Sequence, residues 1–246
     1  MVEKKKELPK QIGRYEVRSQ LGTGGMGHVY RVFDPVNQRE LALKELKFSY
    51  PRALHYFKRE FRAVAQFSHP HLVNLHDLYH EEDRYFYTME LVEGQDIYHY
   101  VNQHNQVIRD PKVLAQGARV ERVFQAFTQL LQALDYLHSN SCIHRDIKPA
   151  NILVDKRGKV RLVDFGVIKE EIPGGEGQSL SQVFGTSTYF SPEQSLSSRV
   201  TTATDIYAAG VVLYELLVGV TPFEGTHEEV CEMHRSKPVT PILERV

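Results

Sequence analysis

Hydrophobic and polar residues alternate along short segments in the N-terminal part of the chain, and this pattern predicts β-strands. The segments are residues 15–21, 28–33, 40–46, 72–79 and 85–91. Residues 52–66 instead have helical spacing, with an apolar stripe formed by Phe57, Phe61, Val64 and Ala65. We therefore expect a small antiparallel sheet with one main helix.

The rest of the chain has mostly helical patterns. Residues 121–138 place leucine, valine and phenylalanine on one helical face, and residues 202–219 are apolar nearly all round, as in a central buried helix. Asp205, near the start of that second helix, is a candidate to cap it. A short strand pair, 152–154 and 160–163, interrupts the helices. The patterns together predict an α+β fold with a small sheet unit and a larger helical unit.

Composition narrows the function classes. The 246 residues are 41% hydrophobic, enough for a substantial core near the size at which one core divides into two. A net charge of -1 gives no broad basic field for nucleic acid. The charged first residues lack the apolar core of a signal peptide, and the longest apolar run, 208–220, contains Glu215 and is too short to span a bilayer. Two cysteines do not support a disulfide framework, so we expect a cytoplasmic chain.

The chemistry-bearing residues lie around the strand pair. His144-Arg145-Asp146 is followed by Lys148 and Asn151, and then by Asp164-Phe165-Gly166. Magnesium prefers hard oxygen ligands, which Asn151 and Asp164 supply. Asp146 is suited to orient a hydroxyl and accept its proton, and Lys148 to neutralise charge on a phosphoryl group. Each fragment alone is common, but this order and spacing predict phosphoryl transfer from a nucleotide.

A glycine-rich segment, 22–27, matches the pattern G-x-G-x-x-G, which alone is weak evidence. A dinucleotide-binding turn would require a helix at its last glycine, whereas residues 28–33 alternate like a strand, so we interpret the segment as a hairpin. Its glycines would let the backbone approach a triphosphate. Lys44, on a following strand, is then a candidate phosphate ligand, and Glu60 a candidate partner for it, although ordinary solvation of either side chain is the alternative.

These motifs, in this order, resemble the eukaryotic-type protein kinase family over residues 15–235, and its serine/threonine branch through Lys148-Pro149-Ala150-Asn151. The segments 191–194 and 204–215 are most similar to bacterial members. The resemblance implies a two-lobed kinase fold, with an N-terminal lobe at 15–92 and a C-terminal lobe at 93–246. It also implies that Asp205 braces the backbone around His144 and Arg145.

The resemblance implies roles for individual residues. The implied nucleotide-binding residues are Leu21, Gly22, Gly24, Gly27, Val29, Ala42, Lys44, Met89, Glu90, Val92, Asp96 and Leu153. The implied catalytic residues are Asp146, Lys148, Lys44, Glu60 and Thr186. Among them Met89 is the gatekeeper, Glu90 and Val92 hold adenine through backbone groups, and Asp96 contacts the ribose.

The expected activity is ATP- and magnesium-dependent transfer to serine or threonine hydroxyls of a protein, with self-association for autophosphorylation and with neither nucleic acid nor membrane as partner. Ser179 and Ser181 are candidates for regulatory phosphorylation that would pair with Arg145, or they only solvate their loop. A kinase-like binding protein is the rival interpretation, and the segment 185–193 disfavours a small-molecule phosphotransferase.

Two further features complete the sequence picture. The chain ends where the family continues with further helices, so that Glu193 would lack its usual arginine partner; this predicts a fragment or a short member.

Four histidines lie close together in the sequence, and we interpret them as partly buried polar residues in preference to a metal site. They are His69, His71, His76 and His80.

Overall fold

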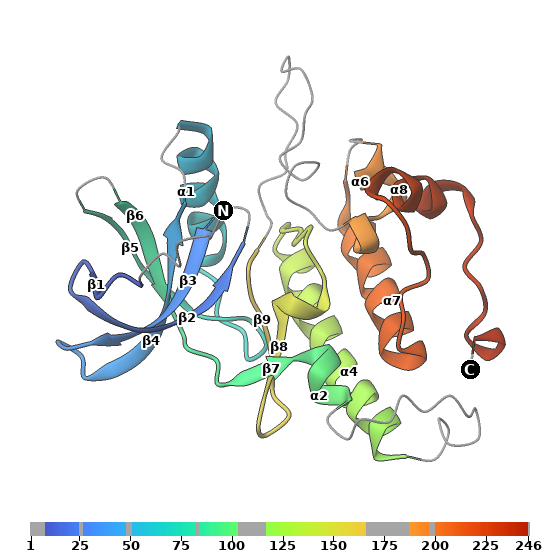
Figure 1. The fold of residues 1–246 in the computed structure, drawn as a ribbon, viewed down its shortest axis with the longest axis horizontal. Helices are drawn as coiled ribbons and strands as arrows, with labels where there is room; N and C mark the ends of the chain where they lie inside the picture. The colour runs from blue at the N-terminus through green and yellow to red at the C-terminus, as the bar shows by residue number, and fades with distance from the viewer. Residues whose placement is uncertain are drawn as a thin grey trace, which may run out of the picture. The chain divides into compact units, whose positions relative to one another are not determined.

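The computed structural model describes residues 8–24, 27–47, 51–81, 84–102, 117–165, 187–196 and 200–245 (Figure 1). The chain divides into two compact units. Unit 1 comprises residues 1–67 and 73–92, and unit 2 comprises residues 68–72 and 93–246. Unit 1 is a sheet with one helix and unit 2 is mostly helical, which is the α+β arrangement predicted from the sequence.

Unit 1 is built on a six-stranded antiparallel sheet with the strand order β1-β2-β3-β4-β6-β5. The strands are β1 (Gln11–Ile12), β2 (Tyr15–Thr23), β3 (Gly27–Asp34), β4 (Arg39–Leu46), β5 (Leu75–Glu81) and β6 (Arg84–Met89). The alternating segments of the sequence all became strands. The strand predicted at 72–79 begins later, at Leu75, because residues 71 and 72 pair with another segment in unit 2.

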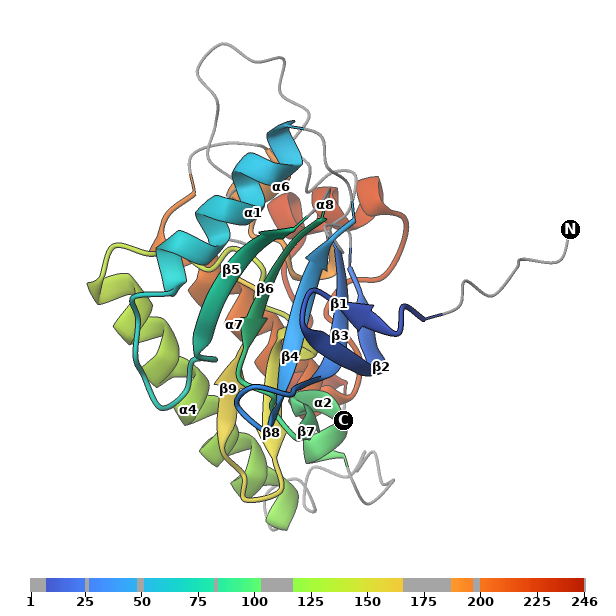
Figure 2. The ribbon, with the colours of Figure 1, turned by 90° about the vertical axis from the view of Figure 1, so that its left-hand side faces the viewer.

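The core of unit 1 explains why the sheet folds. One buried cluster consists of Ile12, Tyr15, Tyr30, Val32, Leu41, Leu43 and Phe86. The helix α1 (Pro51–Val64) packs against β4 and β5, as Figure 2 shows. Its residues Phe57 and Val64 are buried, and the Phe57 ring lies 5.0 Å from the ring of Tyr87 on β6. Phe57, Phe61 and Val64 of the predicted stripe therefore face the sheet, whereas Ala65 lies beyond the end of the helix and is exposed.

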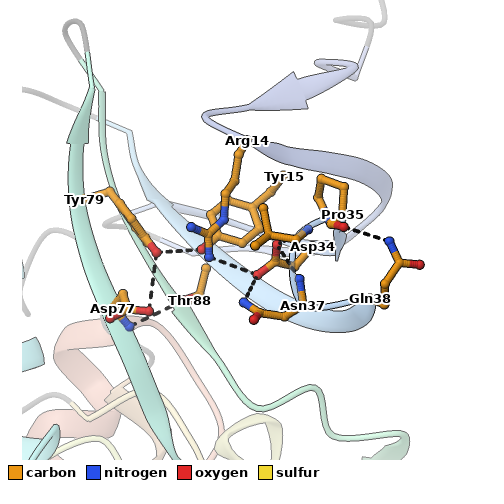
Figure 3. Close-up of polar contacts among 10 residues, drawn as sticks. Arg14, Tyr15, Asp34, Pro35, Asn37, Gln38, Asp77, Tyr79 and Thr88 are labelled. Carbon is orange, nitrogen blue, oxygen red and sulfur yellow. Dashed lines mark hydrogen bonds and ion pairs between the residues drawn. The ribbon is translucent and has the colours of Figure 1, made fainter.

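A polar network ties two turns of unit 1 together (Figure 3). The fully buried carboxylate of Asp34 accepts from the Asn37 side chain at 2.7 Å and from Arg14 at 3.0 Å. The Arg14 guanidinium lies 5.0 Å from the ring of Tyr15, whose hydroxyl donates to that of Tyr79 at 2.8 Å. These bonds hold the β1–β2 turn against the β3–β4 turn.

Unit 2 contains five described α-helices, a three-stranded antiparallel sheet and three 3-10 turns. The helices are α2 (Ile97–Val101), α4 (Ala118–Ser139), α6 (Pro192–Ser195), α7 (Thr202–Val218) and α8 (His227–Ser236). The strands, in the order β7-β8-β9, are β7 (Gly94–Asp96), β8 (Ile152–Asp155) and β9 (Val160–Leu162). The 3-10 turns are η1 (Pro149–Asn151), η2 (Ser187–Tyr189) and η3 (Ile242–Glu244). The helices α4 and α7 lie side by side (Figure 1). Val123, Leu130, Leu134 and Leu137 of α4 are buried, whereas Phe124 and Leu131 of the same apolar pattern are exposed.

The ends of α7 correct one expectation. Thr201 is the N-cap, and its hydroxyl accepts from the Ala203 amide at 3.3 Å. The prediction that Asp205 caps this helix was wrong, because its carboxylate binds backbone amides of another segment. Gly219 ends the helix with φ of 89°, a left-handed conformation that glycine adopts without strain.

The link from α1 to β5 is anchored within unit 2. The His71 carbonyl accepts from the Leu162 amide of β9 at 2.9 Å, and Leu72 bridges to the same strand. The His71 Nδ1 lies 3.2 Å from the Val160 carbonyl, and the His69 ring stacks on Tyr136 at 4.9 Å. His76 and His80 lie on β5. In the part of the chain that the structure describes, no three histidine, cysteine or carboxylate side chains gather as metal ligands.

Candidate active site

Two of the predicted catalytic side chains, Asp146 and Lys148, meet the predicted metal ligand Asn151 in the loop that follows α4. Lys148 Nζ donates to Asp146 Oδ2 at 2.8 Å, and Asn151 Nδ2 donates to the same oxygen at 2.9 Å. Asn151 Nδ2 also donates to the Asp146 carbonyl at 2.8 Å. The turn η1 begins with Pro149, whose fixed φ suits a first helical position, and it folds the chain back so that Asn151 reaches Asp146. The carboxylate is held from two sides while a quarter of the Asp146 side chain stays exposed.

His144 connects this loop to the segment of Asp164. Its ring is fully buried, and Nε2 lies 3.2 Å from the Val163 carbonyl. A carbonyl only accepts, so Nε2 carries the proton and Nδ1 accepts from the Asp146 amide at 3.3 Å. Burial lowers the pKa of His144, against raising contributions from Asp205 and Asp146, so the ring stays neutral. Both bonds suit this single tautomer.

Asp205 supports the same loop from α7. Its buried carboxylate accepts from the His144 amide at 2.8 Å and from the Arg145 amide at 2.7 Å. The brace implied by the resemblance is therefore present. A further contact was not anticipated: His138 Nε2, on α4, lies 2.8 Å from Asp205 Oδ2. The carboxylate thus joins two helices to the predicted catalytic loop, which is the segment of residues 144–151.

The backbone is left-handed at two non-glycine residues of this site. Arg145 has φ of 67° and Asp164 has φ of 55°. Residues other than glycine rarely adopt this backbone conformation. It persists where the surrounding contacts enforce it, often at functional sites. For Arg145 the enforcing contacts are the Asp205 carboxylate on its amide and the Gln194 side chain, which donates to its carbonyl at 3.0 Å. Gln194 is another site residue that the sequence did not reveal.

The two predicted metal ligands lie on neighbouring chain segments. The Asn151 carbonyl accepts from the Val163 amide at 2.9 Å, which brings Asn151 beside the residue that precedes Asp164. Both hydrogen bonds from the Asn151 side chain use Nδ2, so its Oδ1 is the atom that a metal would bind. An amide oxygen and a carboxylate form a donor set that fits magnesium.

The glycine-rich hairpin of unit 1 joins β2 to β3, with Thr23 opposite His28 and Gly22 opposite Val29. The Gly24 amide donates to the Gly27 carbonyl at 2.8 Å. A Cβ atom on Gly27 would lie 2.1 Å from the Glu45 carbonyl oxygen, so packing requires glycine there. A Cβ atom on Gly22 or Gly24 would meet no atom of the described residues within 4 Å, so packing against the described part of the chain does not explain those two glycines.

Lys44 lies on β4, opposite Val29 of β3 and Tyr87 of β6. Its side chain is buried, and Nζ lies 5.9 Å from the centre of the Tyr87 ring. Burying a lysine costs free energy unless its charge is compensated. Glu60, its predicted partner, is on α1, but its side chain is outside the described residues, so the pairing stays a prediction.

The predicted adenine-binding segment follows β6. Met89 ends this strand, is buried, and lies opposite Ala42 of β4. The Glu90 amide donates to the Asn74 carbonyl at 2.9 Å, and the Glu90 carboxylate accepts from the Asn74 side chain at 3.3 Å. Val92 follows and is half-buried. Leu21, at the start of the glycine hairpin, is 52% exposed.

Two of the implied nucleotide-binding residues belong to unit 2. Asp96, at the end of β7, lies opposite Leu153 of β8. The Asp96 carboxylate caps α2 by accepting from the His99 amide at 2.9 Å, and its other oxygen lies 2.6 Å from His99 Nδ1. The sequence analysis did not anticipate His99 as a partner of Asp96. Thr186, Ser179 and Ser181 lie outside the described residues.

A cavity of about 10 Å³ borders the catalytic loop, with room for about one water molecule. Arg145, Asp146 and Ile147 line one side of it. Tyr189, Phe190 and Gln194 of the following segment line another. It is too small for a nucleotide, but it marks where the segment of residues 187–194 lies beside Asp146.

Comparison with known proteins supports a family assignment. The family model described as the protein kinase domain matches residues 15–243. The chain is 34% identical over 236 residues to the serine/threonine-protein kinase PrkC of Bacillus subtilis, covering 95% of this chain and 35% of that protein. It is 36% identical over 216 residues to the probable serine/threonine-protein kinase PknB of Lactococcus lactis, covering 86% of this chain and 32% of that protein.

Among solved structures, a mutant of the kinase domain of PknI from Mycobacterium tuberculosis superposes with a TM-score of 0.69 at 25% identity. The match covers 98% of this chain and 85% of that structure. The chain spans about a third of the length of the two curated relatives. Within its described residues, no helix is long and apolar enough to cross a bilayer.

Proposed function

Because this chain belongs to the protein kinase domain family, in its serine/threonine branch, we propose that it transfers the γ-phosphoryl group of ATP to a serine or threonine hydroxyl of a protein, with Asp146 as the catalytic base. The observation that carries this proposal is the convergence of Lys148 and Asn151 on the Asp146 carboxylate. Phosphoryl transfer depends mostly on positioning and electrostatics, and these bonds supply both.

In the proposed reaction Asp146 binds the substrate hydroxyl, orients it and accepts its proton. The bonds from Lys148 and Asn151 limit the rotation of the carboxylate, and the neutral His144 holds the Asp146 amide. A base that is fixed in this way loses little entropy when the substrate binds. Lys148 also carries a positive charge next to the hydroxyl, where negative charge develops during transfer.

We assign Asn151 and Asp164 to magnesium. When bound there, magnesium would neutralise the charge on the phosphate oxygens of ATP. The amide orientation of Asn151 supports the assignment, since Nδ2 is used within the protein and Oδ1 is the atom that remains for a cation. The left-handed backbone at Asp164 is a second supporting feature, because strain of this kind tends to occur where function demands it.

We assign the nucleotide phosphates to the glycine hairpin and to Lys44. No atom of the described residues lies within 4 Å of a Cβ atom placed on Gly22 or Gly24, which supports an approach of the ligand to their backbone. Lys44, buried on β4, would bind phosphate oxygens with Glu60 as its partner. The remaining implied residues, from Leu21, Val29, Ala42, Met89, Glu90, Val92, Asp96 and Leu153 to Thr186, keep the roles that the family assigns to them.

Phosphorylation of Ser179 or Ser181 is our proposal for regulation. Arg145 is next to Asp146, and its backbone is fixed by Asp205 and Gln194. A phosphate that pairs with its guanidinium would tie a regulatory segment to the catalytic loop through charge-assisted hydrogen bonds. Autophosphorylation between two copies of the chain would supply that phosphate.

The test is transfer of labelled phosphate from magnesium-ATP to dephosphorylated β-casein. The Asp146→Asn variant should lose about 10²- to 10⁴-fold in kcat, the usual contribution of a general base, and should bind ATP as the wild type does. The control is Asp135→Asn, at an exposed position of α4. Transfer by Asp146→Asn at the wild-type rate would contradict the assigned base. Nucleotide binding without any transfer by the wild type would favour the kinase-like binding protein.

A further inference from the structure

His234 connects α8 to the segment beside the catalytic loop. The side chain is 5% exposed, and both of its ring nitrogens are within hydrogen-bonding distance of partners in other elements. Nε2 lies 3.0 Å from the Thr188 carbonyl of η2, and Nδ1 lies 2.8 Å from the Tyr207 hydroxyl of α7. The ring also packs edge-on against Phe223, with centroids 5.0 Å apart.

These contacts define a single tautomer. The Thr188 carbonyl only accepts, so Nε2 of His234 carries the proton, and Nδ1 accepts from the Tyr207 hydroxyl. Burial lowers the pKa of His234, against the raising effect of the backbone carbonyls of Thr188 and Ser187, and so favours the neutral ring. The hydrogen bond to Thr188 is thus a directed donor contact from a rigid buried ring.

The segment that receives this bond is coupled to the catalytic loop. Three residues after Thr188, Ser191 is the N-cap of the short helix α6, whose Gln194 donates to the Arg145 carbonyl. Tyr189, the residue after Thr188, donates to Glu215 of α7 at 2.7 Å. Tyr189 and Gln194 also line the cavity that includes Asp146. A shift of Thr188 would therefore be transmitted to the surface next to the proposed base.

We propose that His234 is a positioning residue that holds Thr188, and with it Ser187–Tyr189, beside Asp146, where the hydroxyl of a protein substrate has to approach the proposed base. The inference rests on the proposed kinase function. The partners of His234 belong to η2 and α7, which contain none of the residues assigned to ATP or magnesium, so we expect its loss to affect the protein acceptor and to leave the affinity for ATP unaltered.

Two variants, each with an amide group near the position of one ring nitrogen, test the two hydrogen bonds of His234 separately. In His234→Gln the amide nitrogen replaces Nε2 and retains a donor for Thr188. In His234→Asn the shorter side chain reaches only the Nδ1 position, so the Thr188 bond is lost while an acceptor remains for Tyr207. The matched control is Glu228→Gln, at an exposed position of the same helix. A melting curve of each variant reports whether α8 is still folded.

We expect His234→Asn to raise KM for β-casein about fivefold, the equivalent of one hydrogen bond, with KM for ATP unchanged. His234→Gln, which retains the donor to Thr188, should keep the wild-type KM, and Glu228→Gln should not change it. Equal KM values for β-casein in all variants would overturn the proposal. The proposal would also be overturned if KM for β-casein rose equally in His234→Gln and His234→Asn, in proportion to the fall in their melting temperatures. The role of His234 would then be structural.

Amide hydrogen exchange keeps this test separate from the proposed function. In His234→Asn the amides of residues 187–191 should exchange faster, while those of α8 stay as slow as in the wild type. If the wild type transfers no phosphate but this local change is found, the kinase proposal fails while the anchoring of Thr188 stands. Unchanged exchange at residues 187–191 would refute the anchoring itself.

Discussion

At the scale of single residues, the site depends on buried polar groups that each serve two neighbours. His144 accepts from the Asp146 amide and donates to the Val163 carbonyl, and Asp205 accepts from two consecutive backbone amides. Leaving a buried polar group unpaired costs about 1–3 kcal/mol of folding free energy. The loss of one of these hydrogen bonds would therefore penalise both of its partners. The strained backbone at Arg145 persists because these contacts surround it.

Asp34 provides a prediction about pH. Burial would raise the pKa of this carboxyl, but hydrogen bonds from the side chains of Asn37 and Arg14 and from backbone amides outweigh burial and lower it to about 2, from an ordinary value of 3.8. Since the folded pKa is the lower one, the stabilisation is complete above pH 3.8 and is lost as the pH falls toward 2. Chemical unfolding at several pH values should show this loss in the wild type.

In Asp34→Asn the part of the pH dependence between these two values should disappear, and the variant should be less stable at neutral pH. Asp135→Asn, which alters an exposed carboxylate on α4, serves as the control and should keep the wild-type profile. A wild-type acid profile in Asp34→Asn would show that other carboxylates cause the loss of stability.

At the scale of elements, the glycines of the hairpin differ in their expected roles, since packing requires Gly27 whereas Gly22 and Gly24 are assigned to nucleotide binding. Gly27→Ala should lower the melting temperature, because the new Cβ atom would collide with the Glu45 carbonyl, a backbone atom that cannot move without disturbing β4. Gly22→Ala and Gly24→Ala should leave the melting temperature unchanged and raise KM for ATP, because their methyl groups would meet no described atom of the chain but would meet the bound nucleotide. Melting curves and ATP titrations of the three variants make the comparison. A lower melting temperature in Gly24→Ala would contradict it.

The junction of α4 with α7 gives a second prediction at this scale. The buried Arg119 donates to the carbonyls of Leu216 at 2.6 Å and Leu217 at 3.4 Å, near the end of α7 where helical carbonyls lack intrahelical donors. Its Nε also donates to the Asn102 side chain at 3.1 Å. Arg119→Met should destabilise the protein by about 3 kcal/mol, since several buried acceptors lose a charged donor.

The stability of Arg119→Lys should lie between that of Arg119→Met and that of the wild type. Lysine keeps the positive charge but lacks the planar guanidinium that reaches several acceptors. Arg157→Met, at an exposed position after β8, is the control in the same denaturant titration. Equal stability of Arg119→Met and the wild type would mean that the junction does not depend on these bonds.

At the scale of the whole molecule, the sequence predicted patterns that repeat over a whole element and missed contacts between distant residues. Alternation and helical spacing located the main strands and helices within a few residues, whereas β1, β7, α2 and α6 are too short to have a recognisable period. The pairing of His138 with Asp205 joins residues 67 positions apart, and that of Gln194 with Arg145 spans 49. Neither has a local signature.

Asp205 illustrates both outcomes. Its position in the motif indicated the brace on His144 and Arg145 correctly, while the local rule that an acidic residue near a helix start serves as its cap was wrong. The carboxylate is turned to amides of another segment, and Thr201 caps the helix instead. Tertiary contacts therefore overrode a local preference at the residue most closely tied to the catalytic loop.

The division into two units leads to the last prediction. Leu43 is fully buried in the core of unit 1, and Leu134 is fully buried on α4 in unit 2. Truncation of either leucine to alanine removes packed methyl groups and leaves a cavity, which typically costs about 2–5 kcal/mol. Because each unit has its own core, Leu43→Ala should accelerate amide exchange mainly in β2, β3 and β4, and Leu134→Ala mainly in α4 and α7. The exposed Leu243→Ala is the control for each. Equal acceleration in both units by either buried variant would show that the chain unfolds as one cooperative body.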